Sequence, residues 1–304
     1  MSPPLKNVVV VGASGSLGAP VVKELLSQGF TVTALTRANS KSTFPADIVV
    51  KRVEDFSSVP ALTTALQGQD AVVSAVAGEA IGDQKALADA AAAAGVRRFV
   101  PSEFGFNTRT MAEDSPDLFA LLGGKTRFLD YLIEKVTQNE QFSWTGISTG
   151  SFVDWTLGNG LYGIDLAART ATIYDSGDNR FQVASLPFIG KAIASVLSHP
   201  EETKNKYLAI GANTSQNEIL QILEQETAQK WKVEHAQTAD LVTAGRAALQ
   251  NGKHGEAFVP LFLRYAFGEE HSLKPEENKN SLLGLEQEDL TAVVGALVQS
   301  KASA

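Results

Sequence analysis

Short apolar runs and longer segments of helical period alternate along the first 150 residues. Six runs rich in β-branched and apolar residues are typical of buried parallel strands. They cover residues 8–11, 30–37, 48–53, 69–76, 96–100 and 142–147. The segments after Gly18, at 59–66 and at 81–94 have helical composition, and each lies between two of these runs. Strands that alternate with helices predict an α/β fold with a doubly wound parallel sheet.

The first strand leads into a glycine-rich turn, and residues 7–18 read NVVVVGASGSLG. Gly12, Gly15 and Gly18 are spaced three apart, and a helical pattern follows them. Glycines at such a turn let backbone N–H groups approach a pyrophosphate, and the helix N-terminus adds partial positive charge. The stretch therefore predicts a dinucleotide site, although a glycine-rich turn that binds nothing is the alternative.

The end of the second strand indicates which dinucleotide is bound. An enzyme that prefers NAD places Asp or Glu about twenty residues after the glycine turn, where the carboxylate binds the ribose 2′-hydroxyl. This chain has Arg37 and Lys41 there, beside the hydroxyls of Thr36 and Ser40. Two cations suit a 2′-phosphate, so NADP(H) is favoured, unless Arg37 is merely solvated on a loop.

Further cofactor contacts are expected where the other strands end, because ligands of open α/β sheets bind outside the carboxyl ends of the strands. Asp55 and Phe56 follow the third strand and are candidates for adenine contacts. Ala75 and Val76 end the fourth strand and are expected to border the cofactor. The fifth strand delivers the loop 101–105, which reads PSEFG, to the same edge.

One lysine falls on the apolar stripe of a helix that we expect to run from Ser115 to Gln138. At about 100° per residue, Lys125 lies in the middle of the stripe, between Leu118 and Leu132. A buried ammonium is costly, and desolvation lowers its pKa toward a useful range. Lys125 is therefore the catalytic candidate. The alternative is a lysine that reaches water from the edge of the stripe.

The same helix contains a second lysine in a motif that we interpret as a decoy. Tyr131 and Lys135 form the Y-x-x-x-K pair that ordinary short-chain dehydrogenases use for proton transfer. Here the pair lies mostly opposite the apolar stripe. Residue 118, about where those enzymes have a serine, is leucine.

The second half of the chain is expected to cover the substrate. We expect strands at 170–174, 180–183 and 207–210 and helices at 189–197, 216–229 and 256–267, with Ser215 capping the second helix and a mostly helical remainder. The predicted division is a dinucleotide domain at 1–155 and a substrate-covering region at 156–304 that is partly interleaved with it. Phe152 and Trp155, after the sixth strand, are candidate substrate contacts.

Composition excludes several classes of function. The net charge of −8 over 304 residues argues against a nucleic-acid partner. The absence of cysteine excludes disulfides and thiolate chemistry and is compatible with a reducing cytosol, so a cytoplasmic protein is expected. Charged residues interrupt the alanine-rich stretch 71–95, so it is not expected to span a membrane, and no secretory address is expected.

Structural or catalytic metal is not expected. The four histidines, His199, His235, His254 and His271, are scattered without metal-ligand spacing. A surface position is expected for each of them, although His254 or His271 could line a substrate pocket.

Taken together, GASGSLG, the strand end LTR, PSEFG and the lysine within GGK resemble the NmrA-like and isoflavone reductase-like family of atypical short-chain dehydrogenases. The resemblance implies an NADP-binding Rossmann domain with a smaller C-terminal substrate domain. It implies pyrophosphate contacts along the turn from Gly12 to Gly18, with Ser14, Ser16 and Leu17 among them. It also implies that Arg37 and Lys41 bind the 2′-phosphate.

For the reaction centre, the resemblance implies that Phe104 borders the nicotinamide and that Lys125 is the family's catalytic lysine, in contact with the cofactor. Plant members usually have asparagine after the sixth strand, where this chain has Gly150, Ser151 and Phe152. The plant substrates are therefore not transferred.

The leading hypothesis is an NADPH-dependent reductase that passes hydride to a small aromatic, enone, quinone-methide or carbonyl substrate, with Lys125 as general acid or base. One alternative is an NADP(H)-binding redox sensor that acts through a protein partner. Another is an isomerase or dehydratase on the same scaffold. The reductase needs only a small-molecule substrate as its partner.

Overall fold

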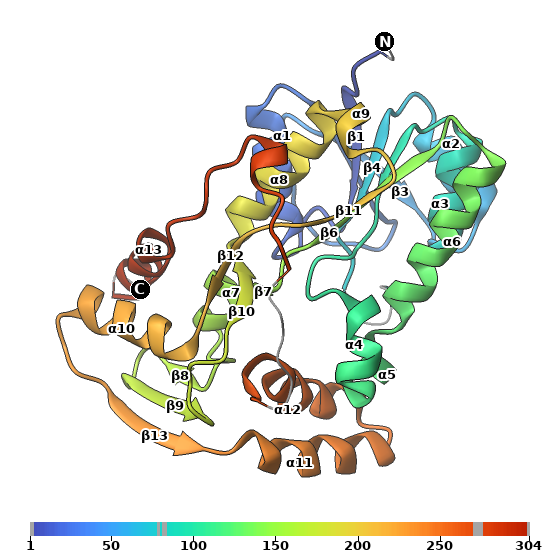
Figure 1. Cartoon of the computed structure of the whole chain (residues 1–304). Coiled ribbons are helices and arrows are strands. Elements are labelled where there is room, and N and C mark those ends of the chain that lie inside the picture. The colour runs from blue at the N-terminus through green and yellow to red at the C-terminus, as the bar shows by residue number, and fades with distance from the viewer. Residues whose placement is uncertain (1–2, 78–79, 81–83, 270–275, 303–304) are drawn as a thin grey trace.

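A parallel sheet forms the centre of the first half of the molecule. The computed structural model describes residues 3–77, 80, 84–269 and 276–302. Within these residues, a seven-stranded parallel sheet has the order β11-β6-β5-β4-β1-β2-β3 (Figure 1). Its strands are β1 (Asn7–Val11), β2 (Thr31–Arg37), β3 (Val49–Val53), β4 (Ala71–Ser74), β5 (Arg98–Val100), β6 (Ser143–Ser148) and β11 (Lys206–Ala209). The predicted Rossmann-type sheet is confirmed.

Helices cover both faces of this sheet. One face packs on α1 (Gly18–Ser27) and α8 (Leu186–Ser198). The other face packs on α2 (Val59–Leu66), α3 (Lys85–Ala93) and α6 (Gly124–Gln138). Val8 and Val10 of β1 enter the first core and Val9 and Val11 the second, with at most 3% of each side chain exposed. This two-sided burial is why the strand reads as an unbroken apolar run.

The strand order reverses next to β1, which places a crevice at one edge. From β1 the chain winds outward through β2 and β3, and then returns to β4 on the other side of β1. Crossovers therefore diverge at the carboxyl ends of β1 and β4, the point where doubly wound sheets bind their ligands. The predicted dinucleotide turn lies at this point.

Residues after β6 build a second lobe but also return to the first. The lobe contains β7 (Ser151–Phe152), β8 (Ile164–Asp165), β9 (Thr170–Tyr174), β10 (Phe181–Ala184), β12 (Ala212–Thr214) and β13 (Lys232–Ala236) in two small sheets. Its helices are α7 (Val153–Gly158), α10 (Gln216–Thr227), α11 (Thr238–Gln250), α12 (His254–Phe267) and α13 (Leu290–Ala302). Between these elements, α8, the short α9 (Pro200–Thr203) and β11 join the first lobe (Figure 1). A 3-10 turn, Ser281–Leu283, packs on α8.

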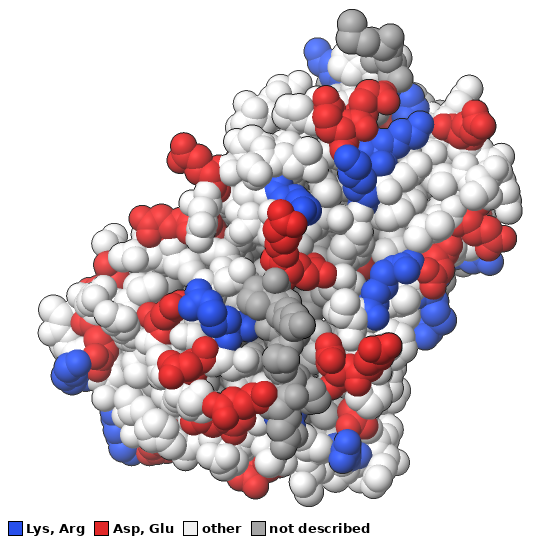
Figure 2. Space-filling model, in the orientation of Figure 1, with Lys and Arg blue, Asp and Glu red and all other residues white. Residues whose placement is uncertain are grey.

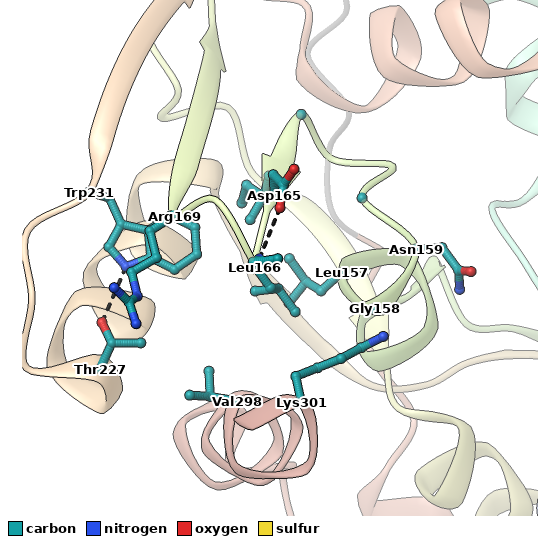
Figure 3. A pocket seen from close by; sticks show the side chains of 14 residues that line it. Leu157, Gly158, Asn159, Asp165, Leu166, Arg169, Thr227, Trp231, Val298 and Lys301 are labelled. Atoms are coloured by element: carbon teal, nitrogen blue, oxygen red, sulfur yellow. Dashed lines mark hydrogen bonds between the residues drawn. The ribbon is translucent and has the colours of Figure 1, made fainter. Parts of the chain in front are cut away.

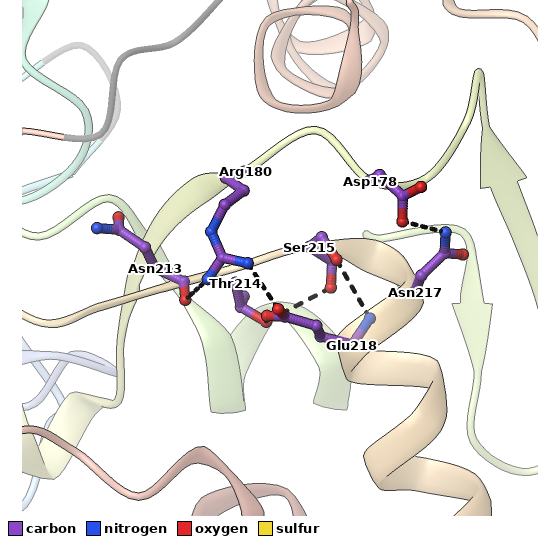
Figure 4. A network of polar contacts seen from close by, with 7 residues as sticks. All are labelled: Asp178, Arg180, Asn213, Thr214, Ser215, Asn217 and Glu218. Atoms are coloured by element: carbon purple, nitrogen blue, oxygen red, sulfur yellow. Dashed lines mark hydrogen bonds and ion pairs between the residues drawn. The ribbon is translucent and has the colours of Figure 1, made fainter.

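Ser215 caps α10 as predicted, and the cap is part of a polar network. The Ser215 hydroxyl accepts the Glu218 N–H at 3.2 Å, and the Glu218 carboxylate pairs with Arg180 at 2.6 Å (Figure 4). Asn217 donates to Asp178 at 2.7 Å. These contacts link the turn before β10, which carries Asp178 and Arg180, to the first turn of α10.

Two expectations about secondary structure are wrong. The helix expected at 115–138 is two helices, α5 (Pro116–Leu122) and α6. They are separated at Gly123, whose ψ of −12° departs from the usual α-helical value. An additional helix, α4 (Thr108–Asp114), precedes them. The mostly helical remainder also contains β13, whose side chains are largely exposed and give no alternating pattern. The predicted helix at 81–94 begins among residues outside the described part, and α3 starts at Lys85.

Every helix in the part of the chain that the structure describes is too short or too polar to span a lipid bilayer. The surface carries charges of both signs. Figure 2 shows Asp and Glu interspersed with Lys and Arg across one face.

Candidate active site

Two glycines of the glycine-rich turn, Gly12 and Gly18, have no room for a side chain. Gly12 has φ +81°, and a Cβ on it would lie 2.4 Å from the Ala75 carbonyl oxygen. A Cβ on Gly18 would lie 2.0 Å from the Gly12 carbonyl oxygen. Ser14, Gly15 and Ser16 are exposed at the start of α1. These features fit a pyrophosphate held by backbone N–H groups.

Leu17 and the end of β4 complete this part of the crevice. The Leu17 side chain is buried in the core below α1, so only its backbone faces the turn. Ala75 is half-buried, and its N–H donates to Val11 at 2.9 Å. The Val76 carbonyl accepts the Ser102 hydroxyl at 2.7 Å, which joins the β4 edge to the loop after β5.

The end of β2 is the cationic side of the crevice. Arg37 and Lys41 are exposed, and the Ser42 hydroxyl lies 3.0 Å from that of Ser14 in the glycine turn. Sequence reasoning missed Arg52 at the end of β3, whose guanidinium donates to the Ser40 carbonyl at 2.9 Å. Arg52 is exposed near the end of β3, which is an edge strand. An exposed cation at such a position is common in any sequence, so the pattern of residues did not mark Arg52 as a site residue.

Asp55 and Phe56 lie after β3, where they were expected, but the carboxylate already has local partners. Asp55 accepts the Ser57 hydroxyl at 2.6 Å and the Ser57 N–H at 2.8 Å, and these bonds lower its pKa. Phe56 is half-buried against the core. The Asp55 carboxylate therefore shapes the turn before α2, and an adenine contact by it stays a prediction.

Lys125 lies inside the molecule, as the helical stripe predicted. Lys125 is in the first turn of α6, and only 5% of the residue is exposed. Its ammonium donates a hydrogen bond to the Phe104 carbonyl oxygen at 3.1 Å. A Cβ on Gly105 would lie 3.2 Å from its Nζ. Burial lowers the pKa of Lys125, and the negative charge of Glu103 opposes that shift. A buried amine with a lowered pKa next to a sheet edge is a candidate for proton transfer.

Sequence reasoning placed the loop 101–105 at the sheet edge but missed Glu103 as a site residue. The Glu103 carboxyl is 1% exposed and lies 3.4 Å from the Tyr207 hydroxyl of β11. Burial raises its pKa, while the Lys125 charge acts in the opposite direction. The available signal was a charged residue three positions after the end of a buried strand, which marks the sheet edge but does not predict the burial of the carboxyl.

An aromatic pocket adjoins Phe104 and Gly105. Its volume is about 160 Å³, and Phe152, Trp155 and Phe262 contribute to its wall. Trp155 is 40% exposed, and the C-terminal helix α12 supplies Phe258, Val259 and Phe262. The structure thus brings both predicted substrate residues together with Phe104. The sequence did not predict that residues of α12 would line this pocket.

The Tyr131 and Lys135 pair lies elsewhere, between α6 and α3. Both side chains hydrogen-bond to the Asp89 carboxylate of α3, with the Lys135 contact at 2.5 Å. Burial and the Asp89 contact raise the pKa of Tyr131. Through these contacts the pair joins α6 to α3, and neither residue lines the aromatic pocket beside Phe104.

A separate pocket of about 630 Å³ lies in the second lobe (Figure 3). Figure 3 shows Val298 and Lys301 of α13 along one wall, and the Trp231 indole donates to Thr227 at 3.2 Å. This pocket shares no lining residue with the aromatic pocket beside Phe104.

Among the described residues, no group of three or more His, Asp or Glu side chains is arranged to hold a metal ion. His199, His235 and His254 are in this part of the chain, and His271 lies outside it.

Comparison with known proteins identifies the family. The model of the NmrA-like family matches residues 4–250. The chain belongs to the NmrA-like family. This NmrA-like protein is 36% identical over 301 residues to the oxidoreductase aprR of Aspergillus flavus, covering 96% of this chain and 99% of that one. It is 33% identical over 293 residues to the oxidoreductase poxI of Penicillium oxalicum, with 94% and 92% covered.

Solved structures confirm the fold of this NmrA-like protein. The complex of leucoanthocyanidin reductase with NADPH from Vitis vinifera superposes with a TM-score of 0.79 at 20% identity. The superposition covers 96% of this chain and 99% of that one.

Proposed function

We propose that this protein is an NADPH-dependent oxidoreductase that reduces a small apolar substrate in the aromatic pocket, with Lys125 as the proton donor. The observation that carries the proposal is the buried Lys125 ammonium, which lies against the loop that forms the pocket wall. Family membership, the two fungal relatives named as oxidoreductases and the fold shared with an NADPH-bound reductase support it.

The glycine turn supports binding of NADP(H). Gly12 and Gly18 leave the backbone open to a pyrophosphate, and Arg37, Lys41 and Arg52 place positive charge where a 2′-phosphate would bind. When bound, NADPH supplies the hydride.

The residues of the chain supply the remaining chemistry. The aromatic walls exclude water from the pocket and orient a flat apolar substrate. The Lys125 ammonium gives a proton to the atom that gains negative charge during reduction. Phe104 and Gly105 line the pocket, and the Phe104 carbonyl accepts a hydrogen bond from the Lys125 ammonium at 3.1 Å, which supports a proton donor next to this part of the wall.

This apolar pocket beside Lys125 favours an enzyme over a redox sensor, because a sensor does not need a substrate space next to a buried amine. The substrate classes that fit are small aromatic, enone, quinone-methide and carbonyl compounds.

The experiment is an assay of NADPH oxidation over a panel of phenylpropenyl, quinone, enone and aldehyde compounds, together with measured dissociation constants for NADPH and NADH. We expect tighter binding of NADPH and turnover of at least one class. An Arg37→Ala variant is expected to weaken NADPH binding and leave NADH binding unchanged. Equal affinity for the two cofactors, or tight NADPH binding with no turnover across the panel, would contradict the proposal.

A further inference from the structure

The carboxyl group of Glu103 is buried with one of its oxygens unused. Only 1% of the residue is exposed, and Oε1 has no hydrogen-bond partner among the described residues. Oε2 has the Tyr207 hydroxyl at 3.4 Å, which is a long contact. A buried carboxyl with so few hydrogen bonds is costly unless a positive charge lies nearby.

Lys125 provides that charge. Its ammonium donates to the carbonyl of Phe104, the residue directly after Glu103, and a Cβ on Gly105 would approach its Nζ to 3.2 Å. The Glu103 side chain packs over β6, where a Cβ on Gly146 would lie 3.6 Å from its Cγ. Both charged groups are therefore enclosed around one short loop.

Other titratable groups around this pair come from α4, β11 and the segment after residue 275. The positive charge of Arg109 in α4 lowers the pKa of both Glu103 and Tyr207, and the negative charge of Glu276 raises the pKa of Tyr207. Arg109 is 41% exposed at its side chain and pairs with Asp130 at the surface, so solvent screens its effect on Glu103. Lys125 is the buried cation whose charge lowers the pKa of Glu103.

We propose that Glu103 is a positioning residue whose carboxylate keeps the Lys125 amine protonated and held against the pocket wall. The inference rests on the proposed function, because it assigns Lys125 the role of proton donor. In each turnover, the Lys125 N–H bond breaks as the proton passes to the reduced substrate, and the amine regains a proton from water. Glu103 keeps its charge throughout and forms no bond.

The direct test is an NMR titration of protein labelled with ¹³C at the lysine side chains, with the Lys125 signal assigned by its loss in Lys125→Arg. Removing the countercharge by Glu103→Gln is expected to lower the pKa of Lys125 by about one pH unit or more. Glu134→Gln, an exposed change on the same helix, is the matched control and is expected to leave it unchanged. An unchanged Lys125 pKa in folded Glu103→Gln would overturn the proposal.

A second variant keeps the test decisive if Glu103→Gln does not fold. Glu103→Asp withdraws the carboxylate by one methylene and is expected to lower the pKa of Lys125 in the same direction by a smaller amount. If folded Glu103→Asp has the wild-type pKa for Lys125, the proposal is contradicted.

Turnover separates this inference from the proposed function. In the active protein, the basic limb of the pH profile of kcat/KM is expected to move to lower pH in Glu103→Gln and to return partway in Glu103→Asp. A merely structural role for Glu103 would lower activity without moving the limb. If the wild-type protein turns over nothing, the proposed function fails, and the NMR titration still decides whether Glu103 sets the charge of Lys125.

Discussion

Gly12 lies in the turn between β1 and α1, against the backbone of Ala75 directly after β4, and sequence spacing alone predicted a glycine turn here. The contacts are local, because a strand, a glycine turn and a helix start follow one another in the chain. The burial of Lys125 was predictable for a similar reason, since helical period places it among apolar residues. Glu103 was not, because its burial depends on Tyr207, which is 104 positions away in the chain.

The Gly12→Ala substitution is expected to destabilise the fold and abolish NADPH binding. The positive φ costs about 1–2 kcal/mol for a residue with a Cβ, and the approach to the Ala75 carbonyl at 2.4 Å adds a backbone clash. Gly29→Ala is the matched control, because Gly29 has φ +79° with nothing within 4 Å of its Cβ position. Urea unfolding measures the stability of the two variants, and NADPH titration measures their affinity for the cofactor. Equal losses of stability and affinity in Gly12→Ala and Gly29→Ala would show that the close contact with Ala75 has no effect.

At the scale of elements, the periodic segments were predictable and their interruptions were not. The bounds of β9 were predicted, and α8, α10 and α12 formed where helical composition placed them. The break at Gly123 escaped prediction because apolar period continues across it from Leu122 to Phe128. The exposed strand β13 escaped because its partner, β9, is 62 positions earlier in register, with Lys232 opposite Thr170.

Arg98 joins three elements at the opposite edge of the sheet, and its removal is expected to be severe. Its buried guanidinium donates to the hydroxyls of Ser143, Thr145 and Thr203 and to the Pro200 carbonyl. Burial lowers the pKa of Arg98 to about 10, so it stays charged at neutral pH.

Arg98→Met leaves these groups with fewer partners and is expected to lower the free energy of unfolding by about 3 kcal/mol. Arg127→Met, at an exposed position of α6, is expected to change it by less than about 0.5 kcal/mol. Urea unfolding of the two variants checks this prediction, and equal stabilities would contradict it.

At the scale of the whole molecule, the second half of the chain closes over the first in ways that no local pattern encodes. The Lys279 N–H donates to the Ala209 carbonyl at 2.7 Å, and the Asn280 side chain forms two hydrogen bonds with the backbone of Gly211. Glu276 accepts the Ser148 hydroxyl at 2.9 Å. These contacts bring the C-terminal segment back to the carboxyl edge of the sheet. The sequence predicted a substrate-covering region but not its path.

The stability of the whole fold is expected to depend on pH through Asp70. Burial opposes its ionisation, but hydrogen bonds from the N–H groups of Asn7 and Lys6 and from Arg97 outweigh this effect and lower its pKa below 3.8. The stabilisation is therefore fully present above pH 3.8 and is lost as pH falls through the lowered value.

Asp70→Asn is accordingly expected to destabilise the protein at neutral pH and to differ progressively less from the wild type below pH 3.8. Urea unfolding across this pH range measures the difference, with the exposed change Asp47→Asn as control. A difference that does not vary with pH would mean that the charge of Asp70 contributes nothing.

The measurement that tests the account most directly compares Lys125→Met with Lys135→Met, in both NADPH affinity and turnover of the best panel substrate. Methionine fills the buried position without a transferable proton, so Lys125→Met is expected to bind NADPH as the wild type does and to lose roughly a hundredfold or more in kcat. Lys135→Met, which removes the lysine of the decoy motif, is expected to retain turnover. Wild-type turnover in Lys125→Met, or its loss only in Lys135→Met, would contradict the assignment of the proton donor.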